Sequence, residues 1–139
     1  MSDFKIFDVA GSGMNAQMVR LNITASNLAN ADSVASSLNQ TYKSRQPVFA
    51  AVFRNALDKT QSTAVAVKVL GVVESPAPLT MEYAPHHPMA NAQGYIFKPN
   101  VNPIEELANM IAASRAYQNN VEVLNTTKEL MLQTLRMGE

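Results

Sequence analysis

Apolar and small residues recur at heptad spacing over the first thirty residues of this 139-residue chain. Their positions alternate four and three residues apart, which is the spacing of a helix that packs along another helix. This spacing predicts a helix over residues 7–30. The positions of this first seam are Phe7, Gly11, Met14, Met18, Leu21, Ala25 and Leu28.

The other end of the chain repeats the pattern over residues 103–137. Pro103 suits the first helical position, Asn102 can cap the helix, and Glu105 and Glu106 favour the positive end of the helix dipole. A helix of roughly 33 residues is about 50 Å long, too long to fold back inside a small globule. The second seam comprises Leu107, Met110, Ser114, Tyr117, Val121, Leu124, Lys128, Met131 and Leu135.

The segment between the two helices has a different character. Six of the seven prolines lie between Pro47 and Pro99, and proline breaks long helices. Several short segments favour β-strands because they are rich in valine or bounded by turn residues. The strand candidates are residues 64–74 (AVAVKVLGVVE), 79–83 and 95–98; residues 48–57 are ambiguous between a helix and a strand, and residues 30–45 resemble a long loop.

These elements predict an α+β fold. Long N- and C-terminal helices are expected to pair as a coiled-coil-like domain made of residues 1–32 and 100–139. A small β-containing middle module of residues 33–99 is expected between them.

The first helix carries almost no charge. Arg20 is the only charged residue between Val9 and Ala31. A solvated helix usually carries Glu and Lys pairs on its outer face. Amides bury at lower cost than ions, so we expect this surface to be covered by neighbouring helices, with amides bonding between subunits. The face away from the seam holds Asn15, Gln17, Asn22, Thr24, Ser26 and Asn27.

Composition excludes several classes of function. The chain has 11 basic and 11 acidic residues, so it lacks the clustered positive charge of a nucleic-acid-binding protein. Without cysteine it has no disulfide, thiolate metal site or cysteine nucleophile. No apolar run approaches the roughly 20 residues of a membrane span, so no direct membrane insertion is expected. Asp3 and Asp8 interrupt the apolar core that a cleaved signal peptide would need.

Residues 11–16 (GSGMNA) match the G-x-G-x-x-A fingerprint of dinucleotide-binding folds. No strand–helix–strand pattern follows, and Asp32 lies in a polar loop rather than at the end of a second strand. The motif is better interpreted as the flexible start of a helix, or as small residues that permit close helix packing.

Other chemical motifs are also incomplete. His86 and His87 are adjacent in a proline-bounded loop, but a stable metal site needs three or four ligands. No Gly-x-Ser-x-Gly elbow accompanies the serines. We therefore expect no catalytic residue, no cofactor and no metal.

The heptad seams are better explained by assembly than by an ordinary internal core. Both are sustained over three or more heptads, and both helices are too long for the module between them. Several seam positions are methionines, which can repack against non-identical neighbours. The predicted assembly residues are Phe7, Met14, Met18, Leu21, Asn22, Leu28, Leu107, Met110, Tyr117, Val121, Leu124, Met131 and Leu135.

Both ends of the chain resemble the bacterial flagellar rod and hook proteins. The N-terminal resemblance rests on residues 4–17 (FKIFDVAGSGMNAQ), 20–22 (RLN) and 25–32 (ASNLANAD). The tail is similar to that of the proximal-rod members of this family. Its matching segments are residues 100–107 (NVNPIEEL), 113–118 (ASRAYQ) and 125–126, with further similarity over residues 42–50 (YKSRQPVFA) and 95–103.

The resemblance implies a structural protein without enzymatic activity. Such proteins pass through the flagellar type III export apparatus without a cleaved signal, and polymerise helically into the rod of the basal body. The rod crosses the periplasmic space and transmits torque. Expected partners are other copies of the chain, the other flagellar rod proteins and the adaptor between the rod and the membrane ring, and no cofactor is implied.

The sequence leaves two alternatives open. One is a coiled-coil adaptor of a secretion apparatus, and the other is a small nucleotide-binding enzyme that uses residues 11–16. For the rod interpretation, we expect largely disordered terminal segments before assembly, because a monomer lacks the neighbours that would order them.

Overall fold

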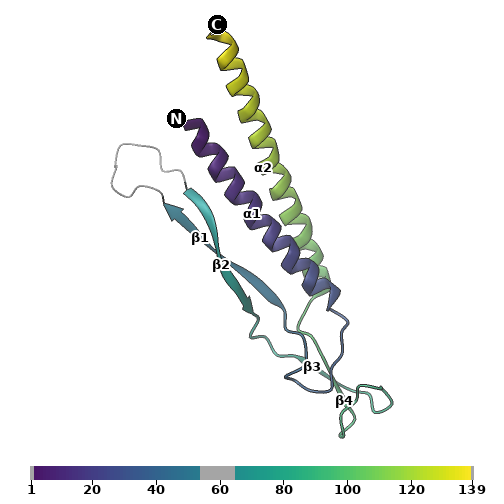
Figure 1. Cartoon of the computed structure of the whole chain (residues 1–139). Coiled ribbons are helices and arrows are strands. Elements are labelled where there is room, and N and C mark those ends of the chain that lie inside the picture. Colours follow the sequence, from purple (N-terminus) through teal and green to yellow (C-terminus); the bar gives the residue numbers. More distant parts are fainter. Residues whose placement is uncertain (1, 54–64, 139) are drawn as a thin grey trace.

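The computed structural model describes residues 2–53 and 65–138 and confirms the predicted α+β class (Figure 1). Two long helices form the two ends of the described chain, and four strands lie between them in sequence. The order is α1 (Ser2–Ala29), β1 (Arg45–Phe53), β2 (Val65–Glu74), β3 (Thr80–Tyr83), β4 (Tyr95–Lys98) and α2 (Pro103–Met137).

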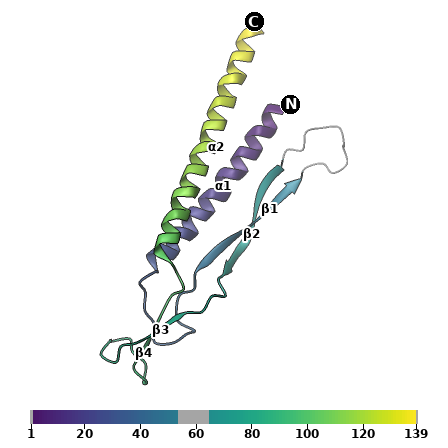
Figure 2. The same ribbon diagram turned by 180° about the vertical axis from the view of Figure 1, so that it is seen from behind.

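The two helices run antiparallel and side by side, as Figures 1 and 2 both show. α2 begins as predicted: the side chain of Asn102 accepts a hydrogen bond from the backbone N–H of Ile104, and Pro103 is the first residue. α1 begins at Ser2, earlier than predicted. The glycine-containing segment therefore lies inside a continuous helix, and is not its flexible start.

Strands β1 and β2 form a long two-stranded antiparallel ribbon. The pairing runs from Arg45 opposite Glu74 to Phe53 opposite Val65, with a bulge where Val48 is followed by Phe49. The ambiguous segment 48–57 is thus a strand as far as Phe53, and its remainder lies outside the described residues. Ala64, the first residue of the predicted strand 64–74, also lies outside them.

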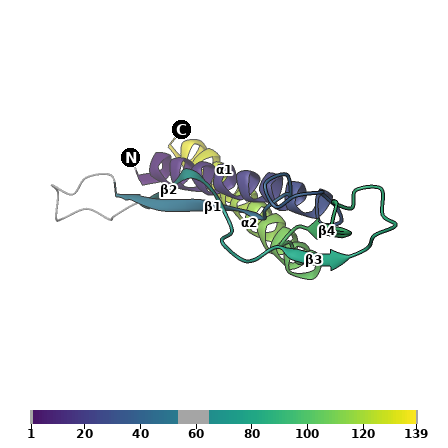
Figure 3. The same ribbon diagram turned by 90° about the horizontal axis from the view of Figure 1, so that it is seen from below.

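The ribbon lies along α1, so α1 contacts both α2 and the ribbon (Figures 1 and 3). Ser12 of α1 is hydrogen-bonded to the ribbon at Val67, near the start of β2. The Ser12 hydroxyl donates to the Val9 carbonyl (2.8 Å) and accepts from the Val67 backbone N–H (3.1 Å).

Strands β3 and β4 form a second, shorter hairpin near the end of the helix pair where α2 begins. Its turn is stabilised by the Asn91 side chain, which accepts from the backbone N–H groups of Gln93 and Tyr95. Gly94 has φ +82°, a conformation that glycine adopts without strain. The loop after α1 is attached to this hairpin, because Ala35 and Phe97 exchange two backbone hydrogen bonds.

The apolar core is small. Among the described residues, the buried apolar side chains are Ala10, Ala16, Ala35, Ile96, Phe97 and Ala113. Four of the six are alanines, and many large apolar side chains remain exposed. Within the described residues, folding of the single chain therefore buries few of the large apolar side chains.

Candidate assembly surface

One face of α2 packs on α1 and follows the predicted heptad spacing, but it is not the predicted seam throughout. Four predicted seam residues lie half-buried on this face: Met110, Tyr117, Leu124 and Met131. The positions between them are occupied by Glu106, Ala113, Asn120 and Thr127, each one residue before the predicted Leu107, Ser114, Val121 and Lys128. Glu106, Ala113 and Thr127 are the buried residues of α2. The inward face is therefore rotated slightly from the predicted seam.

Polar and small residues mediate much of the contact between the helices. The Arg20 guanidinium donates to the side-chain carbonyl of Asn109 at 2.9 Å. Gly13 lies against the Asn120 side chain, so closely that a Cβ added at Gly13 would be 3.0 Å from the Asn120 amide nitrogen. The glycine thus serves close helix packing, which was one of the two interpretations offered by the sequence.

Asn27 joins the C-terminal end of α1 to the start of β1 and is only 1% exposed. Its side-chain oxygen accepts from the Tyr42 hydroxyl (2.7 Å) and from the Arg45 backbone N–H (2.9 Å). Its amide nitrogen donates to the Arg45 carbonyl (2.8 Å) and lies 3.4 Å from the Ser44 hydroxyl. The expectation that this amide bonds between subunits is wrong, because its partners belong to the same chain.

A second amide extends this polar junction to the segment before α2. The Asn100 side-chain oxygen accepts from the Ser44 backbone N–H at 2.7 Å. Its amide nitrogen donates to the Ala77 carbonyl at 2.8 Å. Ser44 also accepts, through its own carbonyl, a backbone bond of 2.7 Å from Ser75. Heptad spacing did not predict this junction because it reports only apolar positions, and the one signal in the sequence was the set of amide and hydroxyl side chains on the first helix that includes Asn27.

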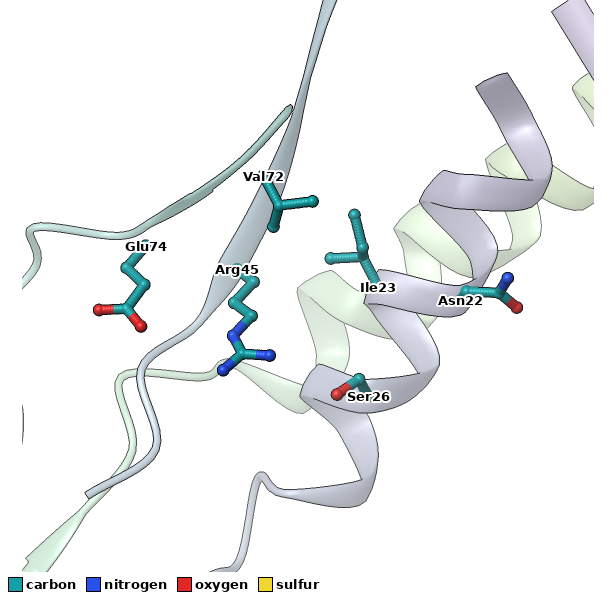
Figure 4. Close-up of a pocket in the computed structure, with 6 residues that line it drawn as sticks. All are labelled: Asn22, Ile23, Ser26, Arg45, Val72 and Glu74. Carbon is teal, nitrogen blue, oxygen red and sulfur yellow. The ribbon is translucent and has the colours of Figure 1, made fainter. Parts of the chain in front are cut away.

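A cleft of about 440 Å³ opens between α1 and the ribbon, next to the Asn27 junction (Figure 4). Figure 4 shows Ile23 and Val72 on its opposite sides, with the guanidinium of Arg45 toward Ser26 and Glu74 farther from α1. The Glu74 Oε2 atom lies 3.9 Å from the Lys43 Nζ atom. The lining combines apolar and exposed charged side chains without a set of converging catalytic groups.

The predicted assembly residues are accessible in the single chain. Of the thirteen, none is buried. Nine are half-buried, namely Phe7, Met14, Leu21, Leu28, Met110, Tyr117, Val121, Leu124 and Met131. Four are exposed, namely Met18, Asn22, Leu107 and Leu135. Their role between subunits remains a prediction.

The face of α1 that neither α2 nor the ribbon covers is uncharged over most of its length. From Gly11 onward its exposed positions are Gly11, Asn15, Met18, Asn22, Ala25 and Ala29. Three of these belong to the predicted first seam. Small and amide side chains allow another helix to approach closely without stripping water from ions.

The motifs of competing functions do not acquire the geometry they would need. Residues 11–16 lie within the continuous helix α1, whereas a dinucleotide fingerprint forms the turn between a strand and a helix. His87 is used locally, since its Nδ1 accepts from the Met89 backbone N–H at 3.0 Å. Within residues 2–53 and 65–138, no three His, Asp or Glu side chains gather as metal ligands. No helix in that part of the chain is long and apolar enough to cross a membrane.

Known proteins match both the ends and the whole of the chain. Residues 7–35 match the family described as flagella basal body rod protein, and residues 92–137 match the C-terminal family of the flagellar basal body rod FlgEFG proteins. Over its full length the chain is 48% identical to the full-length flagellar basal-body rod protein FlgC of Yersinia enterocolitica. It is 47% identical to that of Salmonella typhimurium and 30% identical to that of Bacillus subtilis, with full coverage of both. The resemblance inferred from the sequence is confirmed.

Proposed function

Because this chain belongs to the FlgC family of flagellar basal-body rod proteins, we propose that it is a structural subunit of the flagellar rod. It polymerises through its two terminal helices into the shaft that crosses the periplasm and transmits torque. Residues 1–32 and 100–139 form the helical part of the shaft, and residues 33–99 form an outer module.

The observation that carries this proposal is the amount of surface left uncovered. A compact monomer of 15.1 kDa is expected to expose about 7,100 Å². This chain exposes 9920 Å². Large apolar side chains contribute to that surface on both helices and on β2, including Met18, Leu70 and Leu135. Surfaces of this kind are typical of subunits that complete their cores by association.

We propose the following partners and location. The chain contacts other copies of itself, the other rod proteins, and the adaptor that joins the rod to the membrane ring. It reaches the periplasmic part of the basal body through the flagellar type III export apparatus, without a cleaved signal peptide. It acts without a cofactor, because its task is mechanical.

Deletion of the gene in the source organism tests the proposal. We expect loss of the whole flagellum, seen by electron microscopy, and its return when the intact gene is supplied. An empty vector is the control. Normal flagella in the deletion strain would refute the rod function, and loss of a different secretion activity would favour an adaptor.

A further inference from the structure

The contact between α1 and α2 encloses a polar atom that has no partner. Among the described residues, the Gln17 Oε1 atom is the one fully enclosed side-chain oxygen or nitrogen without a hydrogen bond. Gly13 lies against Asn120 one turn before Gln17, and Arg20 donates to Asn109 one turn after it. Residues three and four apart share a face of a helix, so Gln17 lies between these two contacts, on the side of α2.

The opposite stretch of α2 explains why this oxygen lacks a donor. Midway between Asn109 and Asn120 lie Ala113 and Ala116, whose side chains cannot donate, and Ala113 is completely buried. The backbone N–H groups of this stretch are bonded within the helix. A buried acceptor without a donor retains the full cost of losing its hydrogen bonds to water.

A second uncompensated group, Glu106, lies one turn nearer the start of α2. It is 8% exposed, and within residues 2–53 and 65–138 its carboxylate has neither a hydrogen bond nor an ion pair. Arg20 and Arg45 line the same cavity of about 420 Å³. Arg20 is bonded to Asn109 instead, and the Arg45 guanidinium lies over the Tyr42 ring, 5.5 Å from its centroid. A buried carboxylate without a cation is costly, and the positive end of α2 offsets part of that cost.

We propose that Gln17 and Glu106 keep the α1–α2 pair from forming stably in a single chain. The apolar side chains that are buried on these helices are Ala10, Ala16 and Ala113, so little apolar area offsets the two costs. This inference rests on the proposed function and adds a device to it. The two residues keep the terminal segments unpaired during export, and neighbouring subunits supply the stabilisation that pairs them in the rod.

Alignment of the two helices requires neither residue. Gly13 with Asn120 and Arg20 with Asn109 already fix how α1 and α2 lie along each other (Figure 2). An apolar side chain of the same length would fit at position 17 without an unpaired atom. A weak pair instead suits a chain that passes through a narrow channel unfolded and folds only at its destination.

Two substitutions with matched controls test the proposal. Gln17→Met replaces the amide with an unbranched apolar side chain of similar length and similar helix propensity. Its control is Gln118→Met, the same replacement at an exposed position of α2. Glu106→Met removes the buried carboxylate, and its control, Glu105→Met, removes the exposed carboxylate beside it.

Circular dichroism at 222 nm on the full chain, at concentrations where sedimentation shows a monomer, measures how much helix forms. We expect Gln17→Met and Glu106→Met each to raise the ratio of paired to unpaired helices by about 5- to 30-fold. The two controls should change that ratio by about twofold or less.

Export is measured in the deletion strain as the amount of subunit outside the cytoplasm relative to the amount inside. The double variant Gln17→Met with Glu106→Met should be exported several-fold less than the double control. Addition of Ala25→Gly, at an exposed position of α1, lowers helix stability again and should restore export.

Variants at positions 17 and 106 that gain no more helix than their controls would overturn the proposal and leave the rod function standing. More helix with unchanged export, or export that Ala25→Gly does not restore, would overturn the role in export. Normal flagella in the deletion strain would refute the rod function and the export role with it, whereas the helix measurements would still decide the effect of the two residues on pairing.

Discussion

Asn27 shows how one buried amide holds two parts of this chain together. Its oxygen and its nitrogen are both used, and its partners lie on the segment that enters β1. A satisfied buried amide stabilises modestly, whereas removal of the amide leaves its partners unpaired in a dry site. Asn27 is therefore expected to matter more than any exposed amide of α1.

Asn27→Ala should lower the free energy of unfolding by about 2–4 kcal/mol, because the Tyr42 hydroxyl and the Arg45 N–H lose their acceptor. Chemical denaturation at protein concentrations high enough for the helices to form measures this change, and faster hydrogen exchange at the Arg45 amide would locate it. Asn22→Ala, on the exposed face of the same helix, is the control and should change stability by less than about 0.5 kcal/mol. Equal effects from the two variants would contradict the role given to Asn27.

The two glycines of α1 provide a second contrast at this scale. A Cβ at Gly11 meets nothing within 4 Å, so Gly11→Ala should stabilise the helix by about 0.5–1 kcal/mol. Gly13→Leu should destabilise the chain by about 1–3 kcal/mol, since the Asn120 side chain occupies the space it needs. Thermal unfolding followed at 222 nm, at protein concentrations high enough for the helices to form, distinguishes the two. A tolerated Gly13→Leu variant would show that α1 and α2 do not approach closely there.

At the scale of the elements, α1 has a double role. It packs on α2 with one face and on the β1–β2 ribbon with another, and its third face is exposed. Two covered faces explain why a helix of 28 residues carries so few charges. Part of the uncharged surface of α1, which predicted contact with other subunits, is therefore covered within the same chain. The uncharged face that stays exposed is available to neighbouring subunits.

Leu124 lies half-buried on the inward face of α2, in a seam that depends on apolar contact. Leu124→Asp should abolish rod assembly and motility without unfolding the β3–β4 hairpin, because a carboxylate cannot be desolvated in that seam. Swimming in soft agar measures function, and hydrogen exchange at the Phe97 amide reports on the hairpin. Asn125→Asp adds the same charge at the adjacent exposed position and should keep motility. Motile cells carrying Leu124→Asp would count strongly against this role.

At the scale of the whole molecule, the chain is extended and has a small core. The buried apolar side chains are mostly alanines, and the largest fully buried side chain belongs to Asn27. The helices therefore gain limited stabilisation from each other, and the remaining stabilisation must come from neighbouring subunits.

In dilute solution, we expect the two terminal segments to be largely disordered and rapidly cleaved by proteases, and to gain helicity as the chain associates. Circular dichroism over a range of protein concentrations, combined with limited proteolysis, measures this. The β3–β4 hairpin is the internal control, because Ile96 and Phe97 are buried and Phe97 is bonded to Ala35. Full helicity and protease resistance at both ends of the dilute monomer would disprove this expectation.

The extents of the helices and three of the four strand positions followed from the sequence with small errors. Capping residues, prolines and apolar spacing are local signals that act through nearby backbone, so they can be read in order along the chain. The predicted start of α1 was wrong because the heptad spacing was counted from Phe7, whereas the helix begins at Ser2. The proposed division into residues 1–32 with 100–139 and residues 33–99 remains a prediction.

The sequence by itself determined that two long helices flank a small β module, and that the first of them carries too little charge to stand alone in water. Only the tertiary structure decided which faces are covered within the chain. Heptad spacing gives the interval at which contact residues recur along a helix. Which side of the helix faces its partner also depends on the other elements that pack on it. Because the ribbon lies on one side of α1, Asn27 is buried and Ser12 is half-buried against Val67, and α2 presents Ala113 and Thr127 toward α1.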